Sequence, residues 1–156
     1  MEKRWEWGLE LLHHIEQQLA RADNKAQYTL VVDALLLVGL ILIAPAGGRP
    51  VLHLLVFLAT AALLVSIFFC LSVVMPKLNP PGLQVNLFYF SSILTVSEAD
   101  FASRFRALTP EEVESMLLAE LYVLSAITQG KFLKIRRSHI ALYLGLGLWA
   151  LAFLLR

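Results

Sequence analysis

The sequence predicts an all-α membrane protein with three transmembrane helices, of which the first and the last extend into a cytoplasmic helical stalk. Of its 156 residues, 58% are hydrophobic and 16% are charged. In soluble domains about half of the residues are hydrophobic and about 25% are charged. The apolar residues collect in three long runs, as is expected where lipid is the solvent. Lipid offers backbone groups no hydrogen bonds, so each run must be helical to cross.

Proline, glycine and charged residues set the limits of the predicted segments. The resulting segments are a leader (1–27), a transmembrane hairpin (28–75, with spans 28–44 and 51–75), a cytoplasmic helical segment (76–138) and a third span within 139–156. A fourth crossing over residues 83–96 is the alternative. That stretch has 14 residues, five of them polar, which is too short for a span.

Basic residues are distributed unequally among these segments. Eleven of the 13 Lys and Arg residues lie in the leader or in the segment 76–138, and only Arg49 and Arg156 lie elsewhere. The positive-inside rule places the two segments that contain these eleven basic residues in the cytoplasm. The amino terminus is therefore expected inside the cell and the carboxy terminus on the opposite side of the membrane.

The leader continues into the first span as one amphipathic helix. Its seam residues follow one another at steps of three and four: Leu12, Ile15, Leu19, Ala22, Ala26, Thr29 and Asp33. No Pro or Gly interrupts residues 9–38, so this helix is expected from near Trp5 to Pro45.

The carboxy-terminal part repeats this plan. Thr109-Pro110-Glu111-Glu112 is typical of a helix start, with a capping hydroxyl, a proline and then acids. A helix from Pro110 to Leu155 would be ~69 Å long, and Gly130 is an expected weak point. Its expected seam is Leu117, Leu121, Leu124, Thr128, Phe132, Ile135, His139 and Leu142. A further helix is expected over residues 86–107, and the rich apolar stripes outside the bilayer predict a homo-oligomer.

Asp33 is the most informative residue of the predicted spans. An aspartate at mid-membrane costs about 2.5–3.5 kcal/mol, so its side chain should face protein or water. It either contacts another protomer or a pore, or forms a hydrogen bond within one chain. Ridges of small residues predict close helix packing: Ala62, Ser66 and Cys70 in the second span, and Ala141 and Gly145 in the third.

A basic cluster precedes the third span: Lys131, Lys134, Arg136 and Arg137. One interpretation is topological, because basic residues gather at the cytoplasmic interface and attract anionic lipid. The other is a binding site for a phosphate-bearing ligand, completed by Lys25.

The sequence contains no recognisable catalytic motif. His13 and His14 are adjacent and therefore lie on different helix faces, with no third ligand placed for a metal. Glycine-rich phosphate loops, nucleophile elbows and paired acids are also missing from the pattern. We therefore expect no enzyme, no cofactor, no metal and no nucleic-acid partner.

Four short motifs resemble the transmembrane effectors of the Pycsar system. Ala22-Asp23-Asn24-Lys25-Ala26 resembles the signature at the start of that family's first span. Asn86-Leu87-Phe88-Tyr89-Phe90 and Ser97-Glu98-Ala99-Asp100-Phe101 are similar to its aromatic block and acidic stretch. Glu120-Leu121-Tyr122 with Lys131 is similar to its last helix. Ser91-Ser92 departs from the glycine and histidine expected after the aromatic block.

The resemblance implies an anti-phage role in the bacterial inner membrane, with the carboxy terminus in the periplasm. In that family a pyrimidine cyclase makes cyclic CMP or cyclic UMP, and the effector then impairs the membrane. Asp23 and Lys25 would contact the nucleotide, or else form a polar contact between the first and third helices. The competing hypothesis is a constitutive membrane scaffold or assembly subunit without a ligand.

Overall fold

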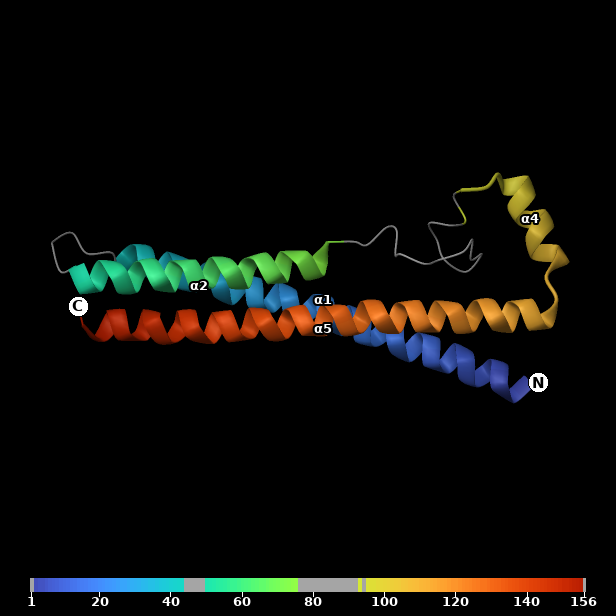
Figure 1. Ribbon diagram of the computed structural model, residues 1–156, viewed down its shortest axis with the longest axis horizontal. Coiled ribbons are helices and arrows are strands. Elements are labelled where there is room, and N and C mark those ends of the chain that lie inside the picture. The colour runs from blue at the N-terminus through green and yellow to red at the C-terminus, as the bar shows by residue number, and fades with distance from the viewer. Residues whose placement is uncertain (1, 44–49, 76–92, 94, 156) are drawn as a thin grey trace. The chain divides into compact units, whose positions relative to one another are not determined.

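A computed structural model describes residues 2–43, 50–75, 93 and 95–155. Its elements are four α-helices: α1 (Glu2–Ile43), α2 (Pro50–Val74), α4 (Glu98–Ala107) and α5 (Pro110–Leu154) (Figure 1). No residue in these ranges belongs to a strand. Three helices, α1, α2 and α5, are long and apolar enough to cross a membrane. The all-α prediction with three transmembrane helices is confirmed.

Local sequence signals explain where α5 begins. The Thr109 hydroxyl accepts a hydrogen bond from the Glu112 N–H at 3.3 Å, and the Glu112 carboxylate accepts one from the Thr109 N–H at 2.8 Å. This reciprocal pair is a capping box, which satisfies two backbone donors at the helix start. From there α5 continues without a break through Gly130 to Leu154, so the prediction of one long third helix is confirmed.

The middle of the chain differs from the single helix predicted over residues 86–107. Residues 86–92 and 94 lie outside the described residues, and residues 95–97 are not helical. A new helix, α4, starts after Ser97, whose hydroxyl accepts the Asp100 N–H at 3.2 Å and donates to the Asp100 carboxylate at 2.7 Å. The one-helix prediction is wrong at 95–97 because Ser97 caps a new helix there.

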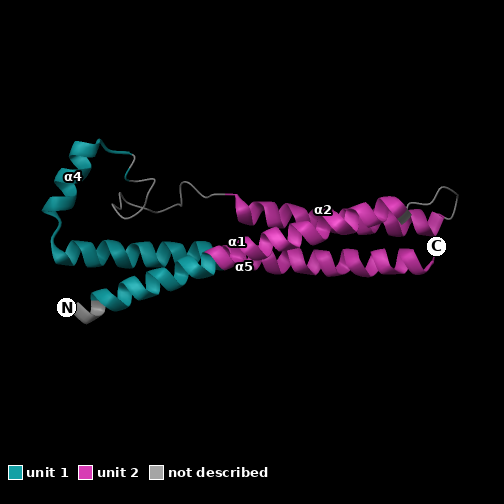
Figure 2. Ribbon diagram, turned by 180° about the vertical axis from the view of Figure 1, so that it is seen from behind, with its two compact units in different colours: residues 1–19, 76–129 teal, residues 20–75, 130–156 magenta. Residues whose placement is uncertain are grey.

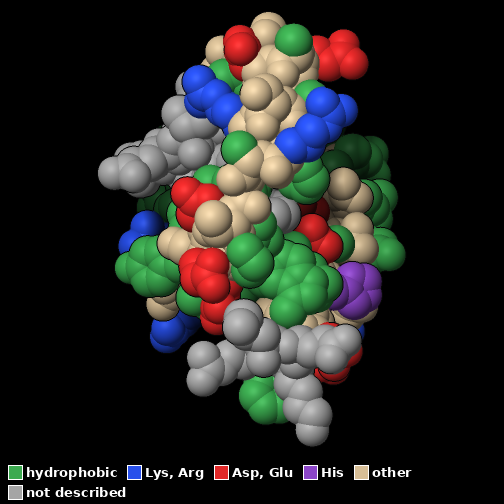
Figure 3. All heavy atoms as spheres, turned by 90° about the vertical axis from the view of Figure 1, so that its right-hand side faces the viewer, with side chains coloured by type: hydrophobic (Ala, Val, Ile, Leu, Met, Phe, Trp, Pro, Cys, Tyr) green, Lys and Arg blue, Asp and Glu red, His purple; other side chains and the backbone are tan. Residues whose placement is uncertain are grey.

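The chain divides into two compact units, each of which includes part of α1 and of α5 (Figure 2). The first unit consists of residues 1–19 and 76–129. Its hydrophobic core, Ile15, Leu117 and Leu121, joins α1 to α5. Gly8 permits this approach, because a Cβ atom there would lie 2.7 Å from a methyl group of Leu117. Acidic, basic and hydrophobic side chains are intermixed on the face shown in Figure 3.

The second unit consists of residues 20–75 and 130–156, in which α1, α2 and α5 lie side by side (Figure 2). Their buried and half-buried positions recur at alternating steps of three and four, which is the repeat of left-handed helical bundles. These positions are Ala22, Ala26, Thr29, Asp33, Leu36 and Leu40 in α1; Leu52, Val56, Ala59, Leu63, Ser66, Cys70 and Val73 in α2; and Lys131, Ile135, Ser138, Leu142, Gly145, Trp149 and Ala152 in α5.

Two apolar layers make up most of this core. One contains Ala22, Ala26, Cys70, Val73 and Ile135, and the other contains Leu40, Ala59, Leu63 and Leu142. On the outside of the bundle, large apolar side chains such as Val31, Leu35 and Phe68 are exposed. A surface of this kind is stable in lipid, because lipid tails solvate it as well as a protein core would.

Candidate functional site in the membrane helices

Four side chains that form hydrogen bonds meet next to the first apolar layer, of which Cys70 is also a member, and we call them the polar layer: Asp33, Ser66, Cys70 and Ser138. They come from all three helices of the second unit. The Ser66 hydroxyl donates to Oδ2 of Asp33 at 2.7 Å and lies 2.9 Å from the Ser138 hydroxyl. The Cys70 sulfur lies 3.0 Å from the same Ser138 hydroxyl. The polar layer therefore links α1, α2 and α5 through side-chain hydrogen bonds.

Asp33 has 0% of its surface exposed, and its second oxygen, Oδ1, has no hydrogen-bond partner among the residues that the structure describes. Hydrogen bonds between membrane helices average about 0.6 kcal/mol. One such bond from Ser66 offsets only a part of the cost of an aspartate inside the bilayer, which reaches about 2.5–3.5 kcal/mol at mid-membrane and is lower near the interface. A neutral polar residue would join the helices at a lower free-energy cost of insertion into the membrane. A carboxylate at this position therefore indicates a functional role rather than a purely structural one.

The hydrogen bond within one chain, which was one of the two alternatives for Asp33, is present. The predicted ridge in the second span is shifted: Ser66 and Cys70 are buried, Ala62 is only half-buried, and Ala59 is fully buried in its place.

The predicted ridge in α5 behaves in a similar way. Ala141 is half-buried, whereas Gly145 lies against α2. A Cβ atom at Gly145 would come within 2.8 Å of a methyl group of Leu63 and 3.5 Å of the Ala59 carbonyl. This glycine therefore marks a close helix contact in the second apolar layer.

Next to the polar layer, Thr29 of α1 meets His139 of α5. The Thr29 hydroxyl donates to the Lys25 carbonyl at 2.8 Å and lies 3.1 Å from Nε2 of His139. A hydroxyl has a single hydrogen, which Thr29 uses toward Lys25, so Nε2 of His139 is the donor in this pair. This geometry requires the imidazole of His139 to carry a hydrogen on Nε2.

The candidate ligand residues gather near the carboxy-terminal end of α2, and most already contact another helix. The Lys131 ammonium forms an ion pair with Asp23, in which the lysine side chain is 11% and the aspartate side chain 33% exposed. This pair is the polar contact between the first and third helices that the sequence left as an alternative. Lys25 lies over the ring of Phe132, 5.4 Å from its centroid.

The other basic residues of the cluster face α2 or solvent. Lys134 donates to the Ser72 carbonyl at 2.9 Å, which is one of the last four carbonyls of α2 and lacks a partner within the helix. The Arg137 guanidinium lies 6.0 Å from the centroid of Phe69, and Arg136 is exposed. Three of the four clustered basic residues therefore hold α5 against α1 or α2.

Sequence reasoning missed Ser138 and placed the seam of α5 one residue too far at two positions. We predicted Phe132 and His139 as seam residues, but both are half-buried at the flank, and Lys131 and Ser138 occupy the inner positions. Both choices fit steps of three and four between Thr128, Ile135 and Leu142. The signal that could have found Ser138 is a hydroxyl at this spacing that can reach Ser66 of the predicted ridge.

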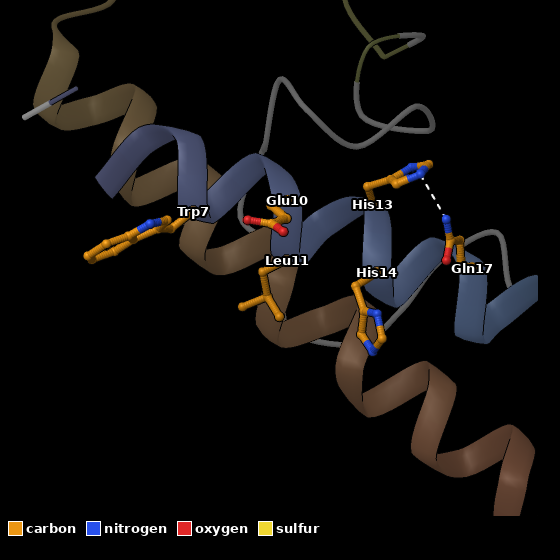
Figure 4. A pocket seen from close by; sticks show the side chains of 6 residues that line it. All are labelled: Trp7, Glu10, Leu11, His13, His14 and Gln17. Carbon is orange, nitrogen blue, oxygen red and sulfur yellow. Dashed lines mark hydrogen bonds between the residues drawn. The ribbon is translucent and has the colours of Figure 1, made fainter. Parts of the chain in front are cut away.

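An open groove of about 490 Å³ lies on α1 in the first unit, lined by Trp7, Glu10, Leu11, His13, His14 and Gln17. His13 and His14 point in different directions, and His13 bonds with Gln17 at 2.9 Å (Figure 4). None of the lining residues is Lys or Arg, so the groove offers little to a phosphate. Within the described part of the chain, no three His, Cys, Asp or Glu side chains are grouped to hold a metal ion.

A family model described as the Pycsar effector protein domain matches residues 8–156, which is nearly the whole chain. The chain belongs to the Pycsar effector family. No curated protein and no solved structure matches it. The resemblance seen in the four short motifs is thereby confirmed, although Asn86–Phe90 lies outside the described residues.

Membership in the Pycsar family gives the chain a general role. Pycsar effectors are anti-phage proteins that work in a system with a partner cyclase, and theirs is not a known catalytic family. Together with the three long apolar helices, the match makes this chain a membrane protein of antiviral defence.

Proposed function

We propose that this Pycsar effector responds to cyclic CMP or cyclic UMP by rearranging its oligomer and impairing the inner membrane, without catalysis of its own. The observation that carries the proposal is the family match over residues 8–156 in a chain whose three apolar helices enclose a buried carboxylate. A scaffold that only holds other proteins in the membrane has no need for a charge at that depth.

The proposed topology places the basic side chains in the cytoplasm. The leader 1–27 and the segment 76–138 are then cytoplasmic, the hairpin 28–75 and the third span in 139–156 cross the bilayer, and the carboxy terminus is periplasmic. The charges that gather near the end of α2 support this orientation, because basic residues mark the cytoplasmic ends of spans. Among the described residues of the other end of the bundle, none is Asp, Glu, Lys or Arg.

The proposed trigger acts on the contacts of Asp23, Lys25, Lys131, Lys134, Arg136 and Arg137. A cyclic nucleotide carries one phosphate charge, which would compete with Asp23 for Lys131 and draw Lys134 away from the Ser72 carbonyl. Those two contacts join α5 to α1 and to α2. Binding would therefore loosen the same helices that surround Asp33, and this links the ligand to the membrane effect.

The first test is membrane potential in bacteria that carry this effector with its partner cyclase. A voltage-sensitive dye should report depolarisation when the cyclase is active or when phage infect, and none when the cyclase is catalytically inactive. If the potential survives both the nucleotide and the infection, the effector role is wrong and the constitutive scaffold is favoured.

The second test is calorimetric titration of the purified protein with cyclic CMP and cyclic UMP. Arg136→Gln should weaken binding by about 1.5–3 kcal/mol, as for a hydrogen bond to a charged group. The matched control is Arg104→Gln, which removes an exposed arginine from α4. Equal affinity of the wild type and Arg136→Gln would exclude this residue from the ligand site.

A further inference from the structure

The direction of the hydrogen bonds in the polar layer is fixed by counting hydrogens. Ser66 donates its only hydrogen to Oδ2 of Asp33, so it must accept from Ser138. Ser138 has then used its own hydrogen and accepts from the thiol of Cys70. Three donors in series, from α2 and α5, therefore point toward one carboxylate.

This series approaches the polar pair formed by Thr29 and His139. Thr29 interacts with the Cys70 thiol and accepts from Nε2 of His139 at 3.1 Å. Polar atoms thus follow one another from His139 through Thr29, Cys70, Ser138 and Ser66 to Asp33. At ~1.5 Å per residue, Thr29 lies about 6 Å and Asp33 about 12 Å beyond Lys25 along α1.

Beyond Asp33 the bundle is closed. The second apolar layer, Leu40, Ala59, Leu63 and Leu142, fills the core on that side. The close contact of Gly145 with Leu63 leaves no room there for a side chain. The polar atoms therefore reach Asp33 from one side only, the side on which the basic residues gather.

We propose that Asp33 is a proton-binding site and that the side chains from His139 to Asp33 form one half of a proton-conducting path through the membrane. Oδ2 of Asp33 takes the hydrogen of Ser66, whose oxygen takes the hydrogen of Ser138, and Ser138 takes that of Cys70. Thr29 turns its hydrogen from the Lys25 carbonyl to Cys70 and takes a new one from an imidazolium at His139. An O–H bond forms at Asp33 and an N–H bond breaks at His139, so the carboxylate and the imidazolium both become neutral.

The charge of Asp33 suits this role. Among the described residues, the titratable side chains that interact with it across the bundle are His139 of α5 and Cys70 of α2. The oxygen Oδ1 has no hydrogen-bond partner among the described residues, so a proton can bind or leave there once the second apolar layer separates. The inference rests on the proposed function in one respect, namely that binding of the cyclic nucleotide separates the second apolar layer.

The test measures proton entry apart from general leakage. Cells with the active cyclase are placed in acidified medium, and a ratiometric reporter follows cytoplasmic pH while an impermeant dye reports large pores. Under this inward gradient the transfers run in reverse, from Asp33 to His139, so the wild type should acidify the cytoplasm. Asp33→Asn keeps the shape and an acceptor for Ser66 but removes the proton site, so acidification should fall by about 100-fold, which is typical of losing a positioned proton acceptor.

Two further variants keep the result interpretable. Asp33→Glu retains a carboxyl and should restore acidification. Thr60→Val removes a hydroxyl whose hydrogen bond, within the described part of the chain, goes to the Val56 carbonyl of the same helix, and it should leave acidification unchanged. Membrane abundance of each variant is measured in parallel.

The outcomes separate the two proposals. Equal acidification by the wild type and by Asp33→Asn, with depolarisation in both, overturns the proton path and leaves the proposed function standing. A wild type that neither depolarises nor acidifies the cells overturns both.

Discussion

Glu120 is a buried acid on α5 in the first unit, where only 7% of its surface is exposed. Burial raises the pKa of its carboxyl, and the nearby acid Glu16 on α1 raises it further. The unfolded chain therefore releases this proton near the ordinary pKa of glutamate, and the folded chain releases it at higher pH. Stability falls as the pH rises through that interval, because the folded state holds the proton more tightly.

Glu120→Gln should accordingly stabilise the first unit at neutral pH and have little effect at a pH below the ordinary pKa of glutamate. The neutral amide keeps the shape and loses the desolvated charge. Thermal unfolding of the protein in nanodiscs, followed by circular dichroism, should show a midpoint a few degrees higher at neutral pH. The control is Glu6→Gln, at an exposed position on α1. A lower midpoint for Glu120→Gln at neutral pH would refute the assignment.

The helices and the inner face of α1 could largely be predicted from the sequence, but parts of the inner faces of α2 and α5 could not. The apolar runs and Pro110 predicted the ends of α2 and α5 to within a residue or two, because helix ends depend on capping and on backbone hydrogen bonds between residues that are close in the sequence. The buried position of Ser138 was not predicted, because lipid solvates apolar side chains as well as a protein core does. In a membrane helix, hydrophobic periodicity therefore does not mark the buried face. The pairing of Lys131 with Asp23, 108 residues apart, depends on how the helices pack, which no local pattern determines.

Two glycines in α5 offer a matched test of how closely the helices approach. Gly145 contacts Leu63 of α2, whereas a Cβ atom at Gly147 would meet nothing within 4 Å. Gly145→Leu should destabilise the bundle by about 1–3 kcal/mol through overpacking, and Gly147→Leu should not. Both variants gain the same helix propensity, so the difference in unfolding midpoint isolates the contact. Equal midpoints would show that α5 does not lie against α2 at this point.

Across the whole molecule, the two units have surfaces suited to different surroundings. The second unit exposes apolar side chains of its membrane helices, and the first combines charged groups with exposed apolar ones such as Trp7, Leu118 and Tyr122. Single exposed apolar residues are common in water, but these large ones occur on both α1 and α5 in the first unit. They support the proposed homo-oligomer.

Light scattering of the protein in mild detergent should therefore find more than one chain in each particle. Leu118→Glu combined with Tyr122→Glu should shift the particles toward single chains, because charges would replace apolar contacts. Ser103→Glu, at an exposed position on α4, should leave the mass unchanged. Uniform single chains of the wild type, both in detergent and in nanodiscs, would count against self-association.

The account depends most on the claim that the three helices of the second unit cross the inner membrane and leave the first unit in the cytoplasm. Its most direct test is labelling of spheroplasts with an impermeant thiol reagent, after Cys70→Ser has removed the single native cysteine. Pro50→Cys should be labelled from outside, and Ser103→Cys should be labelled only after the membrane is permeabilised. Labelling of Ser103→Cys in intact spheroplasts would contradict the account.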